Sequence, residues 1–117
     1  MNAKIEFIKN IPELIIPIIK LTKSKNGKTG TATFLFIEPI ILQTLENYQK
    51  TIDGLYLVWD NKEIYSNDLI IIFKEGKPAF IKSIFIFKNP YEWFNFLSFI
   101  KSYSQETGLS FSEANAL

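Results

Sequence analysis

The fold is decided by residues 79–93, which read AFIKSIFIFKNPYEW, because a strand pattern changes into a helix pattern within them. Up to Phe87 the side chains follow a period of two, which is typical of a strand whose two faces meet different surroundings. Asn89, Pro90 and Glu92 then predict a helix start, with Asn89 as the N-cap, Pro90 at the first helical position and Glu92 closing a capping box. A sheet followed by a helix is therefore expected.

The helix is expected over residues 90–104, because apolar side chains recur there at helical spacing on one side. Gly108 fits the position just past its end, where the backbone often turns left-handed. We expect this helix to cover one face of the sheet and to bury Trp93. The apolar side consists of Trp93, Phe96, Leu97, Ile100 and Tyr103.

Period-two patterning also dominates the residues before this stretch, and turn residues interrupt it at intervals. Pro12 and Pro17 confine the second strand to an edge or a bulge, because proline cannot donate a ladder hydrogen bond. The expected strands cover residues 4–8, 14–22, 31–38, 55–59, 63–73 with a break at 67–68, and 79–87.

The predicted fold class is α+β and strand-dominated. It consists of a curved antiparallel sheet of about five or six strands, a short helix near residues 39–48 and a C-terminal helix near 90–104. Pro39 suits the start of the short helix. At 117 residues the chain fits a single domain, 1–117, in which residues 109–117 form a C-terminal tail.

The composition removes most enzyme chemistry. The chain contains neither His nor Cys, so the usual ligands of zinc and iron-sulfur clusters, the Ser-His base and the thiolate nucleophile are missing. The carboxylates are scattered along the chain, without the pairing that acid-base catalysis needs. We therefore predict no catalytic residue, no cofactor and no metal site, and expect the protein not to be an enzyme.

The charge pattern gives little reason to expect nucleic acid as a partner. The 13 basic residues are all Lys, and with 12 acidic residues the net charge is +1, so no global field attracts phosphates. The lysine-only usage, with 19 Ile and nine Asn, indicates codons rich in A and T, as in an organelle genome. The longest apolar runs, residues 55–59 and 69–73, are far short of the roughly 20 residues that span a bilayer.

Two features remain as candidate binding elements. Lys20, Lys23, Lys25 and Lys28 crowd one strand end and its turn, which is typical of a solvated hairpin but also suits anionic headgroups or an acidic protein loop. The tail at residues 109–112 alternates polar and apolar side chains after the helix. It is expected either to fold back on the protein's own sheet or to pair with a strand of a partner.

Five short blocks, in this order and spacing, resemble a known family. They are residues 30–36, 54–57, 76–78, 89–93 and 108–112. Together they are similar to the small photosystem II protein known as the reaction centre W or thirteen-kilodalton protein, from about Ile5 to Ser112. The chain has Lys near the first turn where relatives commonly have Arg, which keeps the charge but loses the bidentate fork.

The resemblance implies an assembly factor of photosystem II that is peripheral to the thylakoid membrane. It implies transient binding, on the stromal or cytosolic face, to immature complexes that carry the inner antenna but lack a working oxygen-evolving centre. The implied partners are photosystem II core and inner antenna subunits, without nucleic acid, and the free protein is expected to be monomeric. The implied location is the plastid (chloroplast) thylakoid on its stromal side, or the cytosolic side in a cyanobacterium.

The same resemblance implies protein-binding residues in the tail and, more weakly, at the basic turn. A different class of function is the alternative, namely a small β-domain that binds RNA or an anionic ligand through residues 20–28. Salt dependence separates the two, since nucleic-acid affinity falls steeply with salt whereas apolar docking does not. The implied protein-binding residues are Lys23, Lys25, Leu109, Ser110, Phe111 and Ser112.

Overall fold

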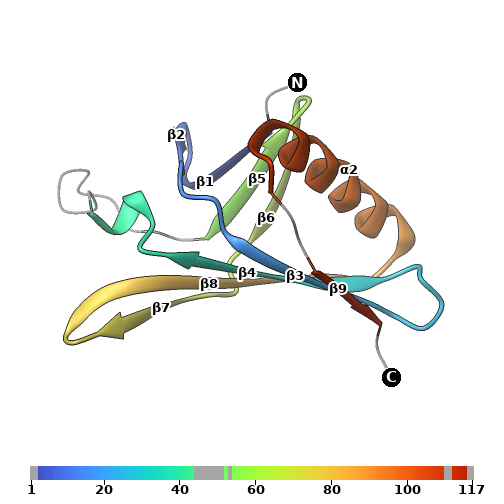
Figure 1. Cartoon of the computed structure of the whole chain (residues 1–117). Helices are drawn as coiled ribbons and strands as arrows, with labels where there is room; N and C mark the ends of the chain where they lie inside the picture. Colours follow the sequence, from blue (N-terminus) through green and yellow to red (C-terminus); the bar gives the residue numbers. More distant parts are fainter. Residues whose placement is uncertain (1–2, 44–51, 53, 110–111, 116–117) are drawn as a thin grey trace.

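The computed structural model describes residues 3–43, 52, 54–109 and 112–115. These residues form nine strands, a long helix and a helical segment at residues 40–43 (Figure 1). The elements are β1 (Lys4–Ile8), β2 (Ile11–Pro12), β3 (Ile18–Lys23), β4 (Gly30–Ile37), β5 (Leu55–Trp59), β6 (Lys62–Ser66), β7 (Leu69–Lys74), β8 (Lys77–Phe87), α2 (Pro90–Thr107) and β9 (Ser112–Asn115).

The strand-dominated α+β class is confirmed, and the strands divide between two sheets where the sequence predicted one curved sheet. A four-stranded sheet has the order β2-β1-β5-β6, and a five-stranded sheet has the order β7-β8-β4-β3-β9. The predicted break at residues 67–68 is the point where the chain crosses between them. Ser66 secures the crossing, because its Oγ donates to the carbonyl oxygen of Ile84 at 2.7 Å and accepts from the Asp68 N–H at 3.1 Å.

The prediction of a second strand over residues 14–22 is wrong at its start. The strand begins only at Ile18, because Pro17 has no N–H to give to a ladder and the residues before it turn around the buried carboxylate of Glu13. Glu13 accepts hydrogen bonds from the N–H groups of Ile15, Ile40 and Ile41 at 2.9, 3.0 and 3.0 Å.

Glu13 thereby caps the beginning of the helical segment at residues 40–43, where free N–H groups favour a negative charge. The predicted short helix near 39–48 is thus seen at its start. Its remainder, with the predicted contacts of Leu45 and Tyr48, lies outside the described residues.

Helix α2 starts as the sequence predicted. The Asn89 Oδ1 accepts from the Glu92 N–H at 2.9 Å, and the Glu92 Oε1 accepts from the Lys88 N–H at 2.9 Å, one residue earlier than a capping box requires. The helix ends at Thr107, three residues later than predicted, because Gly108 supplies the left-handed cap at φ 74°. Trp93 is buried, as predicted, at 1 % exposure.

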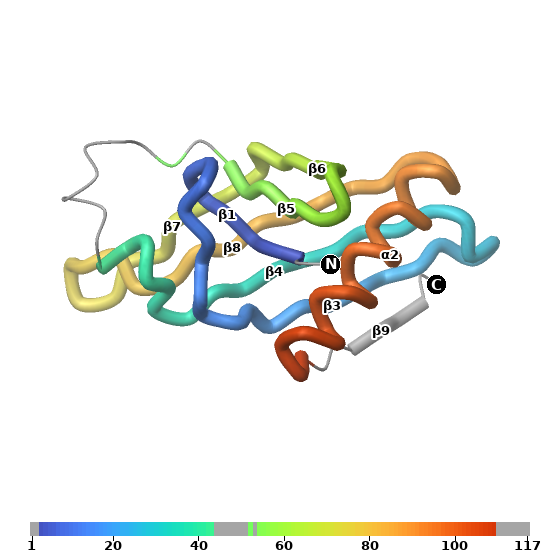
Figure 2. Tube along the Cα trace, turned by 90° about the horizontal axis from the view of Figure 1, so that it is seen from above, coloured from blue at the N-terminus to red at the C-terminus, as the bar shows by residue number. Residues whose placement is uncertain are grey.

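The core lies between the two sheets and α2. Both α2 and the four-stranded sheet lie on the same side of the five-stranded sheet, as the views of Figures 1 and 2 agree. Ala32, Phe34 and Phe36 of β4 share the covered face, as their period of two predicts. The buried side of α2 also includes Phe99, which the predicted stripe lacked, whereas Leu97 is only partly buried.

Candidate functional site

The basic turn between β3 and β4 holds its shape through its own polar groups. The Asn26 Oδ1 accepts from the Ser24 Oγ at 2.6 Å and from the Lys28 N–H at 2.9 Å, while the Ser24 N–H donates to the carbonyl oxygen of Thr29 at 3.0 Å. Gly27 takes the positive φ of 71° that this tight turn needs. The turn therefore presents its lysines from a defined backbone.

The predicted binding lysines differ in exposure. Lys23 closes β3 and is half-buried, whereas Lys25 and Lys28 lie in the turn and are exposed. Lys20, in the middle of β3, is also exposed. The positive charges thus extend from the turn along β3.

The structure brings the tail beside these lysines. Leu109 packs against the core, Ser110 and Phe111 lie outside the described residues, and Ser112 begins β9. Strand β9 pairs with β3 in parallel, with Lys20 opposite Ser112 and Lys23 opposite Asn115. The backbone of residues 112–115 therefore folds back on the protein's own sheet and forms its edge.

The sequence did not reveal this neighbourhood. The tail and β3 are far apart in the chain, and a parallel pairing leaves no hairpin signal in the sequence. Lys23 and Ser112 consequently lie on paired strands, with Lys25 in the adjoining turn, whereas Leu109 packs against the core before β9 begins.

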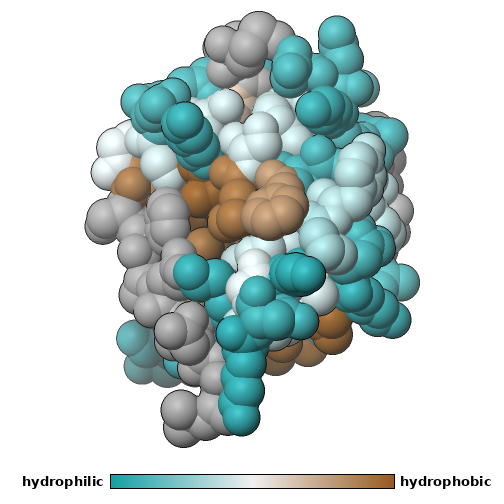
Figure 3. Space-filling model, turned by 90° about the vertical axis from the view of Figure 1, so that its right-hand side faces the viewer, coloured by the Kyte–Doolittle hydropathy of each residue, from teal (hydrophilic) through white to brown (hydrophobic). Residues whose placement is uncertain are grey.

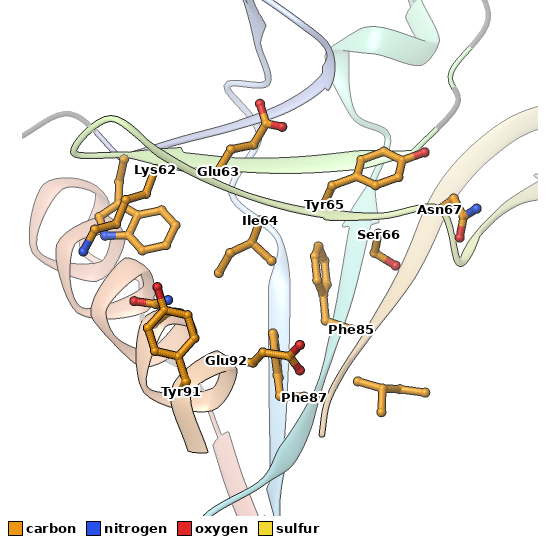
Figure 4. A pocket seen from close by; sticks show the side chains of 13 residues that line it. Lys62, Glu63, Ile64, Tyr65, Ser66, Asn67, Phe85, Phe87, Tyr91 and Glu92 are labelled. Atoms are coloured by element: carbon orange, nitrogen blue, oxygen red, sulfur yellow. The ribbon is translucent and has the colours of Figure 1, made fainter. Parts of the chain in front are cut away.

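A cleft of about 660 Å³ lies between β6, β8 and the first turn of α2. Figure 4 shows Tyr65 on β6, Phe85 and Phe87 on β8 and Tyr91 on α2 around it. Such aromatic walls suit an apolar side chain or a small apolar molecule. Sequence reasoning placed these aromatic residues in strands and a helix but did not bring them together.

The carboxylates of this cleft already have partners. The Glu63 Oε1 forms an ion pair with the Lys9 Nζ at 3.1 Å and, through hydrogen bond and charge, raises the pKa of Lys9. Glu92 is bound by the N–H of Lys88 at the helix start. Both carboxylates therefore have structural roles at the rim of the cleft.

The described part of the chain contains no group of three His, Cys, Asp or Glu side chains that would suit a metal ion. Among the same residues, no helix combines the length and the apolar character needed to cross a membrane.

Comparison with known proteins reveals relatives along nearly the whole chain. A protein from Phaeodactylum tricornutum is 42 % identical over 115 residues, which cover 98 % of this chain and 100 % of the relative. One from Guillardia theta is 37 % identical, with 97 % of both chains covered. One from Synechococcus elongatus is 36 % identical over 97 % of this chain and 100 % of the relative. All three are called "Photosystem II reaction center Psb28 protein".

These matches confirm the expected likeness to a small photosystem II protein and correct the family. The family that matches residues 5–111 is described as "Psb28 protein", not as the reaction centre W or thirteen-kilodalton protein to which the sequence blocks were assigned. Relatives occur both in plastid-bearing algae and in cyanobacteria. The chain belongs to the Psb28 protein family.

Proposed function

We propose that this protein is a non-catalytic assembly factor of photosystem II that binds transiently to immature complexes containing the inner antenna. The observation that carries the proposal is the match over nearly the full length to proteins called photosystem II reaction center Psb28 protein. The described residues add the kind of surface that docking needs, because a basic turn and a sheet edge lie side by side.

The proposed docking region is the edge formed by β9, together with the basic turn. Strand β9 has four residues and pairs in parallel, and its outer side has no neighbouring strand among the described residues. Such an edge can accept an extended loop of a partner through backbone hydrogen bonds. The proposed contact residues are Lys23, Lys25, Leu109, Ser110, Phe111 and Ser112.

The proposed location follows from the proposed partner. We place the protein on the stromal side of the plastid thylakoid membrane, or on the cytosolic side in a cyanobacterium, as a peripheral protein. It is monomeric when free and contacts the photosystem II core and inner antenna subunits. The lysines of the turn suit acidic side chains in a partner loop. Because they would lie at the rim of the interface, they should affect mainly the association rate.

The experiment that tests this function is capture of solubilised thylakoid proteins by the tagged full chain. Bound complexes should contain the reaction-centre subunits and the inner antenna but not the oxygen-evolving centre. Capture of mature complexes in equal amounts would refute the assembly role. Capture of no photosystem II subunit would refute the function itself.

The docking residues are tested separately with Phe111→Ala. If Phe111 is buried only in the complex, its truncation weakens binding by about 2 kcal/mol or roughly thirtyfold and leaves the urea midpoint of the free protein unchanged. Phe73→Ala is the matched control, because Phe73 is 63 % exposed on β7, which forms the opposite edge of the five-stranded sheet from β9. A lower urea midpoint for Phe111→Ala with normal binding would assign Phe111 to the protein's own core.

The alternative function, binding of RNA or an anionic ligand through residues 20–28, makes a different prediction. Affinity for a nucleic acid falls steeply as the salt concentration rises. The reason is that binding releases counterions from the phosphates, and this release is less favourable at high salt. Docking through backbone pairing and an apolar anchor weakens little with salt. Capture of photosystem II subunits that persists at high salt therefore supports the protein partner.

A further inference from the structure

Among the residues that the structure describes, no element packs on one face of the five-stranded sheet. Helix α2 and the four-stranded sheet lie together on the opposite side, as Figures 1 and 2 show. We call the uncovered side of β3, β4, β8 and β7 the open face. Its side chains follow from the strand register, in which opposite residues share a face.

The open face is unusually apolar for a surface in contact with water. One row across the sheet contains Ile37, Phe80 and Ile72, and the next contains Ile18, Leu35, Lys82 and Ile70. Exposure of the isoleucines is high, at 57 % for Ile18, 55 % for Ile70 and 59 % for Ile86.

Contiguous exposed apolar side chains of this kind mark a binding surface. Figure 3 shows hydrophobic atoms at the lower border of the molecule, on the side of this face.

The charges on the open face are all positive. Within their bounds, β3, β4, β7 and β8 contain five lysines and neither Asp nor Glu. Lys20 and Lys82 project from the open face itself, because each is exposed on a strand whose neighbouring residues are buried. The acidic residues that adjoin these four strands in the sequence lie beyond the strand ends, and they are Glu38, Asp68 and Glu75. Glu113 lies on β9.

This combination fits a lipid surface better than a protein surface. Centres of protein interfaces are rich in Tyr, Trp and Arg and poor in Lys, whereas this face consists of Ile, Leu, Thr and Lys with one half-buried Phe. A lysine whose stem lies among aliphatic side chains can hold its ammonium in the headgroup layer. A second copy is a poorer occupant, because a twofold contact would bring Lys20 and Lys82 of both copies onto one apolar face.

We propose that the open face binds the surface of a membrane that contains anionic lipids. The isoleucines lie at the boundary of the acyl chains, and Lys20 and Lys82 contact the negative headgroups. This inference goes beyond the proposed function and does not depend on it. It would lay the sheet flat on the bilayer, with α2 and the four-stranded sheet on the side away from the lipid.

The test is co-sedimentation of the full chain with vesicles of phosphatidylcholine, with or without an equal share of phosphatidylglycerol. The wild-type protein should bind the anionic vesicles and remain in solution with phosphatidylcholine alone. Each lysine should contribute about fivefold to the affinity for anionic vesicles, so the double variant Lys20→Gln and Lys82→Gln should have a more than tenfold lower affinity. The matched charge control is Lys4→Gln with Lys101→Gln, since both residues are exposed on other elements, and it should change binding less than threefold.

The apolar part of the face is tested with Ile70→Thr and Ile86→Thr, which keep a β-branched side chain on the strand. This variant should lose at least fivefold in vesicle affinity, whereas Phe94→Ser on α2 should lose less than twofold. Urea unfolding confirms that each variant is folded, and only folded variants are compared.

Three results would overturn the proposal. One is the failure of the wild-type protein to bind anionic vesicles. Another is an equal loss of binding in the charge control, which would indicate a diffuse effect of net charge. The third is a dimer in sedimentation equilibrium that the Ile70→Thr and Ile86→Thr variant dissociates, because this face would then be covered by a second copy. None of these results bears on capture of photosystem II, so the two proposals fail separately.

Discussion

Truncation of Trp93 tests how the helix closes the core. Its ring is 1 % exposed and lies with its centroid 5.7 Å from that of Phe87 and 5.9 Å from that of Phe96. Removing a buried aromatic side chain costs about 3–5 kcal/mol, because apolar contacts are lost and a cavity remains. A domain of this kind is stabilised by about 5–15 kcal/mol in total, so Trp93→Ala should remove a large part of the free energy of unfolding.

Gly30 lies against the Trp93 ring, so a substitution there provides a second test of the same contact. A Cβ on Gly30 would lie 2.8 Å from two carbons of the Trp93 ring and 2.7 Å from the backbone oxygen of Thr22. Gly30→Ala should therefore cost about 1–3 kcal/mol through overpacking. The cost should be smaller in the Trp93→Ala background, since one of the two clashes is then gone.

The assay is urea unfolding of both single variants and the double variant, followed by far-ultraviolet circular dichroism. Circular dichroism is needed because Trp93 itself is removed, which alters the fluorescence signal. An unchanged urea midpoint for Trp93→Ala would show that α2 does not close the core. Strictly additive costs would show that Gly30 and Trp93 do not share a contact.

Three further predictions concern titration, a buried carboxylate and the basic turn. Burial, with the charge of Glu13 second, raises the pKa of Tyr103 to about 12. The Tyr103 hydroxyl of the unfolded chain ionises near pH 10, while that of the folded protein stays protonated to about pH 12. The free energy of unfolding is therefore unaffected by Tyr103 below pH 10 and falls between pH 10 and pH 12 by on the order of 2 kcal/mol. Tyr103→Phe should abolish that part of the pH dependence in urea unfolding. Glu13→Gln should cost about 1–3 kcal/mol in the same assay, because one amide oxygen cannot serve three N–H groups, whereas a Glu75→Gln control in the exposed β7–β8 turn should change little. Replacing Lys23, Lys25 and Lys28 by Gln should slow association with immature photosystem II at low salt and have a smaller effect at high salt, and a large rise in the dissociation rate would contradict a steering role.

Local signals explain what could be predicted from the sequence. Asn89, Pro90 and Glu92 lie within four residues of one another, and their capping contacts form within that turn. The buried face of β4 likewise follows from the period of two alone. The predicted stripe lacks Phe99 because it is too narrow. The helix packs against both sheets, and the ring centroids of Phe99 and of Trp59 in the four-stranded sheet lie 5.4 Å apart.

Long-range contacts explain the remainder of the fold. The crossing at residues 67–68 reads as a simple break in a strand, and only the pairing of β6 with β5 and of β7 with β8 places the two halves in different sheets. Glu13 accepts hydrogen bonds from the N–H groups of residues 27 and 28 positions later in the chain, and no spacing in the sequence indicates this. Its role as a cap therefore required the structure.

The candidate site was predicted in its parts and not in its arrangement. Lysines at a turn and an alternating tail are visible in the sequence, which therefore predicts both as binding elements. Their proximity depends on the parallel pairing of β9 with β3, which brings Ser112 beside Lys20. The sequence also carries a signal for the open face. Ile84 and Ile86 of β8 lie on the side opposite Ile81 and Phe85, so both faces of that strand are apolar.

The central claim is that the protein distinguishes immature from mature photosystem II. The most direct measurement is the equilibrium affinity of the purified full chain for photosystem II particles isolated before and after the oxygen-evolving centre is assembled. A transient assembly factor should bind the immature particles at least tenfold more tightly, a difference of about 1.4 kcal/mol. Equal affinity for both particles would contradict the claim.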